Sequence, residues 1–162
     1  MSASGLGYAA AAALAAIFAI AAVAKLRDLD TTEREFTALG LPRAPFFARF
    51  VPLVELSIVA LLVIVPPAGS IAALVSLAFF TTFLVGRLRA GVRVPCACFG
   101  AARARPISAL DIVRNLLLMA LAAVALATDR PVRIGLVDAV VILALVAGAA
   151  ALLHLAGRVR DR

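Results

Sequence analysis

The sequence predicts an all-α integral membrane protein that folds as a bundle of transmembrane helices. Of its 162 residues, 65% are hydrophobic and the mean hydropathy is +1.11, whereas a soluble domain is only about half apolar. Long apolar runs alternate with short segments rich in Lys and Arg. The net charge of +7 does not indicate nucleic-acid binding, because that function needs one solvent-exposed basic face. Here the cations flank apolar runs, where they orient helices in a membrane.

The first apolar run, residues 5–24, has about the 20 residues that a helix needs to cross the hydrocarbon core. A cleavable signal peptide is the rival interpretation, but residues 1–8 contain no Lys or Arg to form its basic region. We therefore predict an uncleaved span, with Lys25 directly after it. Its many alanine residues favour close packing against other helices.

A short helix at the membrane interface is expected over residues 33–39. Thr32 and Glu35 have the spacing of a capping box, which marks its start. The Gly-Leu-Pro sequence that begins at Gly40 should end it, because glycine and proline terminate helices.

The second and third spans are predicted over residues 46–65 and 70–85, with a proline-rich turn between them. Glu55 lies about nine residues into the second span, and at about 1.5 Å per residue it falls near the middle of the membrane. A carboxylate is costly there. We therefore expect Glu55 to face the bundle interior and to be either paired with a cation or protonated.

The fourth span should begin at residue 107 or 109 and end at residue 127. Ser108 and Asp111 have capping-box spacing at its start. Arg114 and Asn115 follow three and four residues after Asp111, so the three side chains share one side of the helix. We expect this side to avoid lipid.

An ion pair between Glu55 and Arg114 is expected, because both lie within spans and their two helices run in the same direction. We interpret this pair as a structural tether that holds the bundle, in preference to a proton path.

A fifth span is predicted over residues 134–155. It divides the chain into a four-helix membrane domain, residues 1–127, and an additional C-terminal helix with a basic tail, residues 128–162. With five spans, the segments 25–43, 87–105 and the C-terminal tail share one side of the membrane and hold most of the basic residues. The positive-inside rule then predicts, for a bacterial plasma membrane, an outside N-terminus, with the cysteine loop and C-terminus in the cytoplasm.

Cys96 and Cys98 are the only cysteines of the chain and stand one residue apart. They can form a disulfide only if the backbone turns sharply, because the two Cα atoms must lie about 4.4–6.8 Å apart. Such a tight bridge should be strained, and strained bridges have the high potentials of catalytic or regulatory disulfides. The arginines around the pair should increase the reactive thiolate fraction. The pair is therefore our candidate for redox chemistry.

Two other interpretations of the cysteines remain open. A structural zinc site needs four ligands, and the chain offers only the two thiols and the distant His154, so we predict no metal site. The other interpretation is that the cysteines are unreactive residues at the membrane surface. Phe99 is expected to pack over the pair rather than stack on a quinone. No cofactor is firmly predicted; a quinone stays open as an alternative, but the sequence does not support it.

The motifs together resemble the MauE family, a membrane component of methylamine utilisation related to DoxX-type proteins. The specific part is the Cys-x-Cys-Phe-Gly motif, formed by Cys96, Cys98, Phe99 and Gly100. Ala21 stands where the family pattern has glycine. The other matching positions fall in order over about residues 5–127: Lys25, Leu26, Arg27, Asp28, Gly40, Leu41, Pro42, Glu55, Arg114 and Asn115.

The resemblance implies a four-span membrane protein that supports thiol-disulfide exchange while a partner, such as a methylamine dehydrogenase subunit, matures. A thioredoxin-like protein is the implied redox partner. The cysteine motif would carry the exchange, with charged and polar residues of the spans in support: Lys25, Glu55, Asp111, Arg114 and Asn115. Whether the chain is itself an oxidoreductase component stays open. The alternative is a non-enzymatic membrane scaffold in which the cysteine pair is structural.

Overall fold

A computed structural model describes residues 3–92, 94 and 106–128 of the chain. The helices in these residues are α1 (Ala3–Arg27), α2 (Leu29–Ala38), α3 (Ala44–Ile64), α4 (Pro66–Arg89) and α5 (Ala109–Thr128). All except α2 are long and apolar enough to cross a membrane. The predicted all-α membrane fold and its first four spans are therefore confirmed. The predicted fifth span, residues 134–155, lies outside the described residues.

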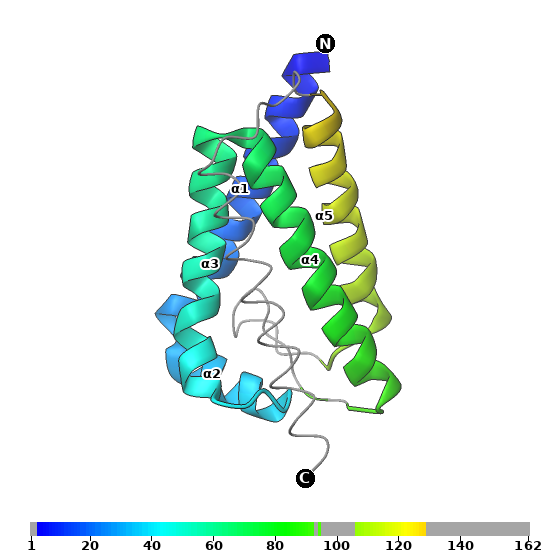
Figure 1. The fold of residues 1–162 in the computed structure, drawn as a ribbon. Coiled ribbons are helices and arrows are strands. Elements are labelled where there is room, and N and C mark those ends of the chain that lie inside the picture. Colours follow the sequence, from blue (N-terminus) through cyan, green and yellow to red (C-terminus); the bar gives the residue numbers. More distant parts are fainter. Residues whose placement is uncertain (1–2, 93, 95–105, 129–162) are drawn as a thin grey trace.

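The four spanning helices form a bundle (Figure 1). Helix α1 packs beside α3 and α5, and α4 also packs beside α3 and α5, so α3 and α5 occupy opposite corners. Helix α2 packs against α3 at the end of the bundle where α4 ends. The start of α1, the turn between α3 and α4, and the end of α5 lie at the other end (Figure 1).

Two apolar clusters form the core, one above the other along the bundle. The large cluster joins all four spanning helices through Ala10, Ala11, Leu14, Ala15, Phe18, Ile58, Leu62, Ala72, Ala73, Leu77, Leu118, Ala122 and Ala125. The small cluster joins α2, the first turns of α3, the end of α4 and the segment before α5 through Phe36, Leu39, Ala44, Phe47, Ala48, Leu84 and Ile107. The alanines that α1 contributes confirm that its small side chains serve close packing.

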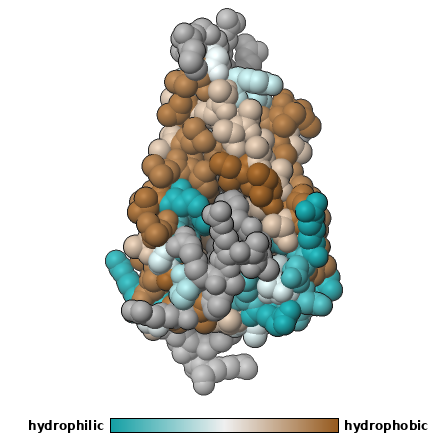
Figure 2. All heavy atoms as spheres, turned by 180° about the vertical axis from the view of Figure 1, so that it is seen from behind, coloured by the Kyte–Doolittle hydropathy of each residue, from teal (hydrophilic) through white to brown (hydrophobic). Residues whose placement is uncertain are grey.

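Basic residues lie at the α2 end of the bundle. They come from the last turns of α1 and α4, from α2 and from the start of α3: Arg27, Arg34, Arg43, Arg49, Arg87 and Arg89. Figure 2 shows one face of the molecule, on which hydrophilic side chains gather mainly toward this end and hydrophobic ones cover the part above it. The folded bundle thus has the charge asymmetry on which the predicted orientation depends. The orientation itself stays a prediction.

Two helix starts differ from the sequence prediction. Helix α4 begins at Pro66 rather than at residue 70, because prolines in a first turn lack only N–H groups that the helix would leave unbonded. Helix α2 begins at Leu29 rather than at residue 33, and its N-cap is Asp28. The capping-box reading of Thr32 is therefore wrong. Its hydroxyl donates to backbone carbonyls at the α1 end instead.

Helix α2 stops just before Gly40, as predicted, and Gly40 has a φ of +73°. The Gly40 N–H donates to the carbonyl of Thr37 (2.9 Å), and the Leu41 N–H donates to that of Phe36 (2.9 Å). This is the Schellman motif, which favours glycine because of the left-handed backbone conformation. Arg87 of α4 then donates to the Gly40 carbonyl (3.1 Å), so the motif also connects α2 to the end of α4.

Asp28 should make the stability of α2 depend on pH. Its carboxylate accepts a hydrogen bond from the Thr31 N–H (3.0 Å), and chiefly this bond lowers the pKa of Asp28 below its ordinary value. The stabilisation is therefore fully present above that ordinary value and is lost as the pH falls through the folded-state pKa. The protection factor of the Thr31 amide, its exchange rate compared with that of an unstructured amide at the same pH, should fall in that acidic range.

Two variants separate the cap from the carboxyl titration. Asp28→Ala should expose the Thr31 amide at every pH, because it removes the acceptor. Asp28→Asn should keep the amide protected but remove the added acid sensitivity, since the Asn side chain caps helices without titrating. Equal acid sensitivity in wild type and Asp28→Asn would contradict the assignment.

Candidate functional site

A polar layer crosses the bundle between the two apolar clusters. In α3, α4 and α5, the polar residues lie between residues of the large cluster and residues of the small cluster. In α1, the polar residue lies beyond the residues of the large cluster. We define the polar layer by Lys25 of α1, Glu55 of α3, Thr81 of α4, and Asp111, Arg114 and Asn115 of α5. Polar side chains at this depth are costly unless they are paired.

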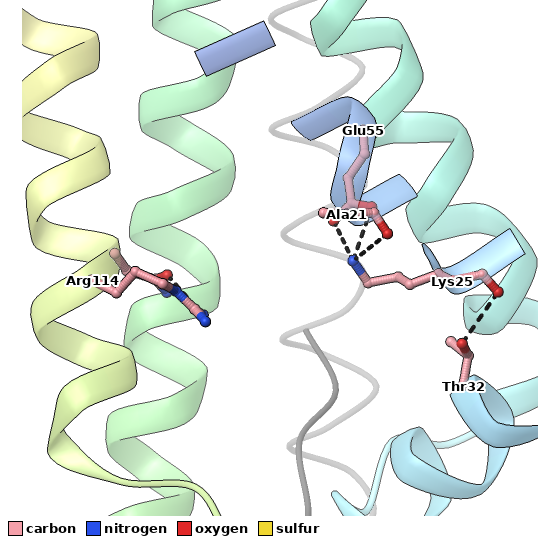
Figure 3. A network of polar contacts seen from close by, with 6 residues as sticks. Ala21, Lys25, Thr32, Glu55 and Arg114 are labelled. Carbon is pink, nitrogen blue, oxygen red and sulfur yellow. Dashed lines mark hydrogen bonds and ion pairs between the residues drawn. The ribbon is translucent and has the colours of Figure 1, made fainter. Parts of the chain in front are cut away.

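Lys25 and Glu55 form an ion pair inside the bundle (Figure 3). The Lys25 Nζ lies 2.7 Å from Oε1 and 3.0 Å from Oε2 of Glu55, and it also donates to the Ala21 carbonyl at 3.4 Å. The two side chains are only 6% and 13% exposed. Charge-assisted hydrogen bonds to both carboxylate oxygens offset much of the cost of burying the two charges. The pair therefore fixes α1 against α3.

The prediction that Glu55 pairs with Arg114 is wrong. Helices α3 and α5 do run in the same direction, but they stand at opposite corners, whereas α1 lies directly beside α3. Lys25 is within reach because α1 continues to Arg27 instead of ending at residue 24. In Figure 3 the Arg114 side chain extends from α5 toward α4, separate from the pair.

The α5 part of the polar layer is a connected set of side chains. Asp111 accepts hydrogen bonds on Oδ2 from the N–H (3.0 Å) and hydroxyl (3.3 Å) of Ser108, and Arg114 Nη1 lies 3.6 Å from its Oδ1. Arg114 Nη2 also donates to Asn115 Oδ1 (3.5 Å), and Asn115 Nδ2 donates to Thr81 Oγ1 of α4 (3.3 Å). Asp111 and Asn115 are 5% and 2% exposed. Two of the three side chains on this side of the helix are thus buried in the bundle, whereas that of Arg114 is 32% exposed, so the prediction that this side avoids lipid stays a prediction.

In the sequence the cysteine motif lies between Val94 and Ile107, two residues that meet at the α2 end of the bundle. The Ile107 N–H donates to the Val94 carbonyl (3.1 Å), and Ile107 is buried in the small cluster with Val94 packed against it. Cys96, Cys98, Phe99 and Gly100 lie outside the described residues, so their predicted contacts stay predictions.

Two threonines contribute contacts here that the sequence did not indicate: Thr81 carried no signal, and Thr32 was assigned to a capping box instead. Thr81 and Thr32 stand among residues of ordinary helix composition, and each hydroxyl also donates to a carbonyl four residues earlier, which is common for threonine in helices. In the part of the chain that the structure describes, no three His, Cys, Asp or Glu side chains gather as a metal site requires. The printed contacts of the polar layer are charge pairing and hydrogen bonds between helices.

Comparison with known proteins identifies the family. Residues 3–128 match the family described as "Methylamine utilisation protein MauE". The methylamine utilization protein MauE of Paracoccus denitrificans is 33% identical over 124 residues, which cover 73% of this chain. This chain spans 66% of the length of that relative. No solved structure matches the chain.

The matched range includes all four spanning helices, the polar layer and the cysteine motif. It ends where α5 ends, so the match does not extend to residues 129–162. Because it includes well over half of the sequence, the chain belongs to the MauE family of methylamine utilisation membrane proteins.

Proposed function

We propose that this protein supports thiol-disulfide exchange during the maturation of a partner protein, with Cys96 and Cys98 as the exchanging pair. The observation that carries the proposal is the place of the motif in the chain. The only two thiols of the sequence lie between Val94 and Ile107, which are joined by a backbone hydrogen bond at the basic end of the bundle, the end that we place at the membrane surface. Exchange with a soluble thioredoxin-like protein requires access of this kind.

The exchange is balanced as a transfer of two electrons and two protons. In the oxidising direction, a partner thiolate attacks one sulfur of the closed Cys96 and Cys98 bridge, which breaks and leaves a mixed disulfide. The second partner thiolate attacks that mixed disulfide and releases a partner protein with a new disulfide. Both cysteines are then thiols, and the disulfide of a thioredoxin-like protein oxidises them again by the reverse sequence.

The maturing partner and the membrane orientation complete the proposal. A methylamine dehydrogenase subunit is the partner we propose, because the relative in Paracoccus denitrificans is named for methylamine utilisation. We place the α2 end and the cysteine loop in the cytoplasm of a bacterial cell. The basic residues at that end support this orientation.

Trapping the thiols in living cells tests the proposed exchange. Rapid acidification and alkylation should reveal both reduced and oxidised forms of the pair, with proportions that change with growth conditions. Cys96→Ser and Cys98→Ser should each abolish partner maturation while the variant protein accumulates normally, because one remaining thiol cannot close the bridge. A mixed disulfide with the thioredoxin-like protein should accumulate in one of the two variants, because the remaining thiolate attacks the disulfide of that protein and no second cysteine is present to resolve the product. It shows which of the two cysteines attacks that disulfide.

A membrane scaffold without redox activity is the second candidate function. It is favoured by the buried ion pair and the polar layer, which hold the helices together without requiring any reaction. A cysteine pair that stays reduced under all conditions, together with Cys96→Ser and Cys98→Ser variants that keep full function, would reject the exchange and support the scaffold.

A further inference from the structure

We propose that the corner of the bundle where α3 begins and α4 ends binds an anionic phospholipid. Three arginines, Arg43 and Arg49 of α3 and Arg87 of α4, hold the phosphate, and we call them the arginine corner. Phenyl rings on the same two helices contact an acyl chain. The proposal does not depend on thiol exchange, because it uses no residue of the cysteine motif.

The arginine corner lies at one level along the bundle. Arg43 is the N-cap of α3, three residues after Gly40, whose carbonyl accepts a hydrogen bond from Arg87 in the last turn of α4 (3.1 Å). Arg49 lies deeper in α3, but its Nη1 donates to the Pro45 carbonyl (3.0 Å) and so points back toward the start of the helix. Arginines in membrane helices reach the interface in this way.

The charges of the arginine corner have no counter-charge in the bundle. The sequence has no Asp or Glu over residues 36–54 or 56–110, and the described residues place no carboxylate within 4.0 Å of these three guanidinium groups. The hydrogen bonds of Arg49 and Arg87 go to neutral carbonyls. An anion from outside the chain can therefore form charge-assisted hydrogen bonds here, and a phosphate suits the guanidinium fork.

Phenyl rings lie on the hydrocarbon side of the arginines on both helices. Phe46, about one turn after Arg43, is 57% exposed and stacks on Phe50 (ring centres 5.3 Å apart). Phe83, about one turn before Arg87, lies with its ring centre 5.2 Å from the guanidinium carbon of that arginine. Cations at the surface with apolar rings beneath them match the two parts of a phospholipid.

The charge of the arginine corner selects among phospholipids. A zwitterionic headgroup brings a cation next to the arginines, whereas an anionic headgroup brings only negative charge. A basic residue near an anionic membrane surface favours binding by about 1 kcal/mol, which is about fivefold in the binding constant. We therefore expect phosphatidylglycerol to bind in preference to phosphatidylcholine.

Native mass spectrometry of the full chain tests this preference. The protein is released from detergent micelles that contain equal amounts of phosphatidylglycerol and phosphatidylcholine with the same acyl chains. Arg49→Gln and Arg87→Gln should each lower the preference for phosphatidylglycerol about fivefold. The triple variant, which adds Arg43→Gln, should bind the two lipids equally. A wild type that binds them equally would reject the proposal.

A matched triple variant separates the arginine corner from net charge. Arg27→Gln, Arg34→Gln and Arg89→Gln remove the same charge from the same end of the bundle. Arg27 and Arg34 lie at the α1–α2 junction and on α2, and Arg89 follows Arg87 by two residues, which places it on the other side of α4. This variant should keep the preference. An equal loss in both triple variants would reject the arginine corner as the site.

Two further measurements guard against misfolding and against binding of phosphate alone. Arg49→Gln removes a hydrogen bond within one helix, so its thermal midpoint without lipid should match wild type while its lipid preference falls. An unchanged preference in this folded variant would contradict the proposal. Phosphatidylglycerol should raise the thermal midpoint of wild type, and inorganic phosphate at the same concentration should not, because it cannot contact Phe46. Equal stabilisation by both would show an anion site and reject the phospholipid.

Discussion

Lys25→Met should sharply reduce the amount of folded protein in the membrane. It leaves the carboxylate of Glu55 buried without its cation, and removing one partner of a buried pair costs about 3–5 kcal/mol, a large part of the stability of most domains. Glu55→Gln should have a similar effect, since it leaves the ammonium of Lys25 buried. Immunoblotting of membrane fractions, with thermal denaturation of the purified variants in detergent, measures both losses.

The double variant distinguishes a pairing effect from the loss of either residue. Lys25→Met with Glu55→Gln leaves no charge uncompensated, so it should recover much of the lost stability. Arg27→Met is the matched control, because Arg27 is an exposed cation in the same last turn of α1, and it should change accumulation little. A Glu55→Gln variant that accumulates normally but loses thiol exchange would contradict the structural tether and favour a proton path.

The spans could be predicted because their signal is local. A run of about 20 apolar residues identifies a membrane helix wherever it lies in the bundle, and the capping-box spacing of Ser108 and Asp111 correctly indicates the start of α5. The end of α2 before the Gly-Leu-Pro sequence could likewise be predicted from adjacent residues alone. The predicted start of α4 was wrong because a helix tolerates proline in its own first turn, as α4 does at Pro66.

The partner of Glu55 could not be predicted because it depends on the order of helices around the bundle. The sequence indicates that α3 and α5 run in the same direction, but not that they stand at opposite corners. The apolar run alone places Lys25 beyond the end of its span, although α1 includes it in its last turn. Thr81 gave no signal at all, because a threonine in a helix usually satisfies its hydroxyl within its own helix.

Gly69→Ala should disrupt the hairpin between α3 and α4. A single residue, Val65, separates the two helices, and a Cβ atom at Gly69 would meet the backbone of Leu62. Backbone in a helix cannot move aside as a side-chain end can, so the helices must separate. We expect a loss of at least about 3 kcal/mol, the upper end for overpacked sites, seen as a lowered thermal midpoint and reduced accumulation.

Gly86→Ala is the control, because Gly86 lies in the same helix with no atom within 4 Å of an added Cβ. There alanine only removes the conformational freedom of glycine, which should stabilise α4 by about 0.5–1 kcal/mol. The same substitution is thus expected to act in opposite directions at the two ends of one helix. If Gly69→Ala were as stable as Gly86→Ala, α3 and α4 could not pack as closely as they do here, and the bundle order that brings Thr81 to Asn115 would need revision.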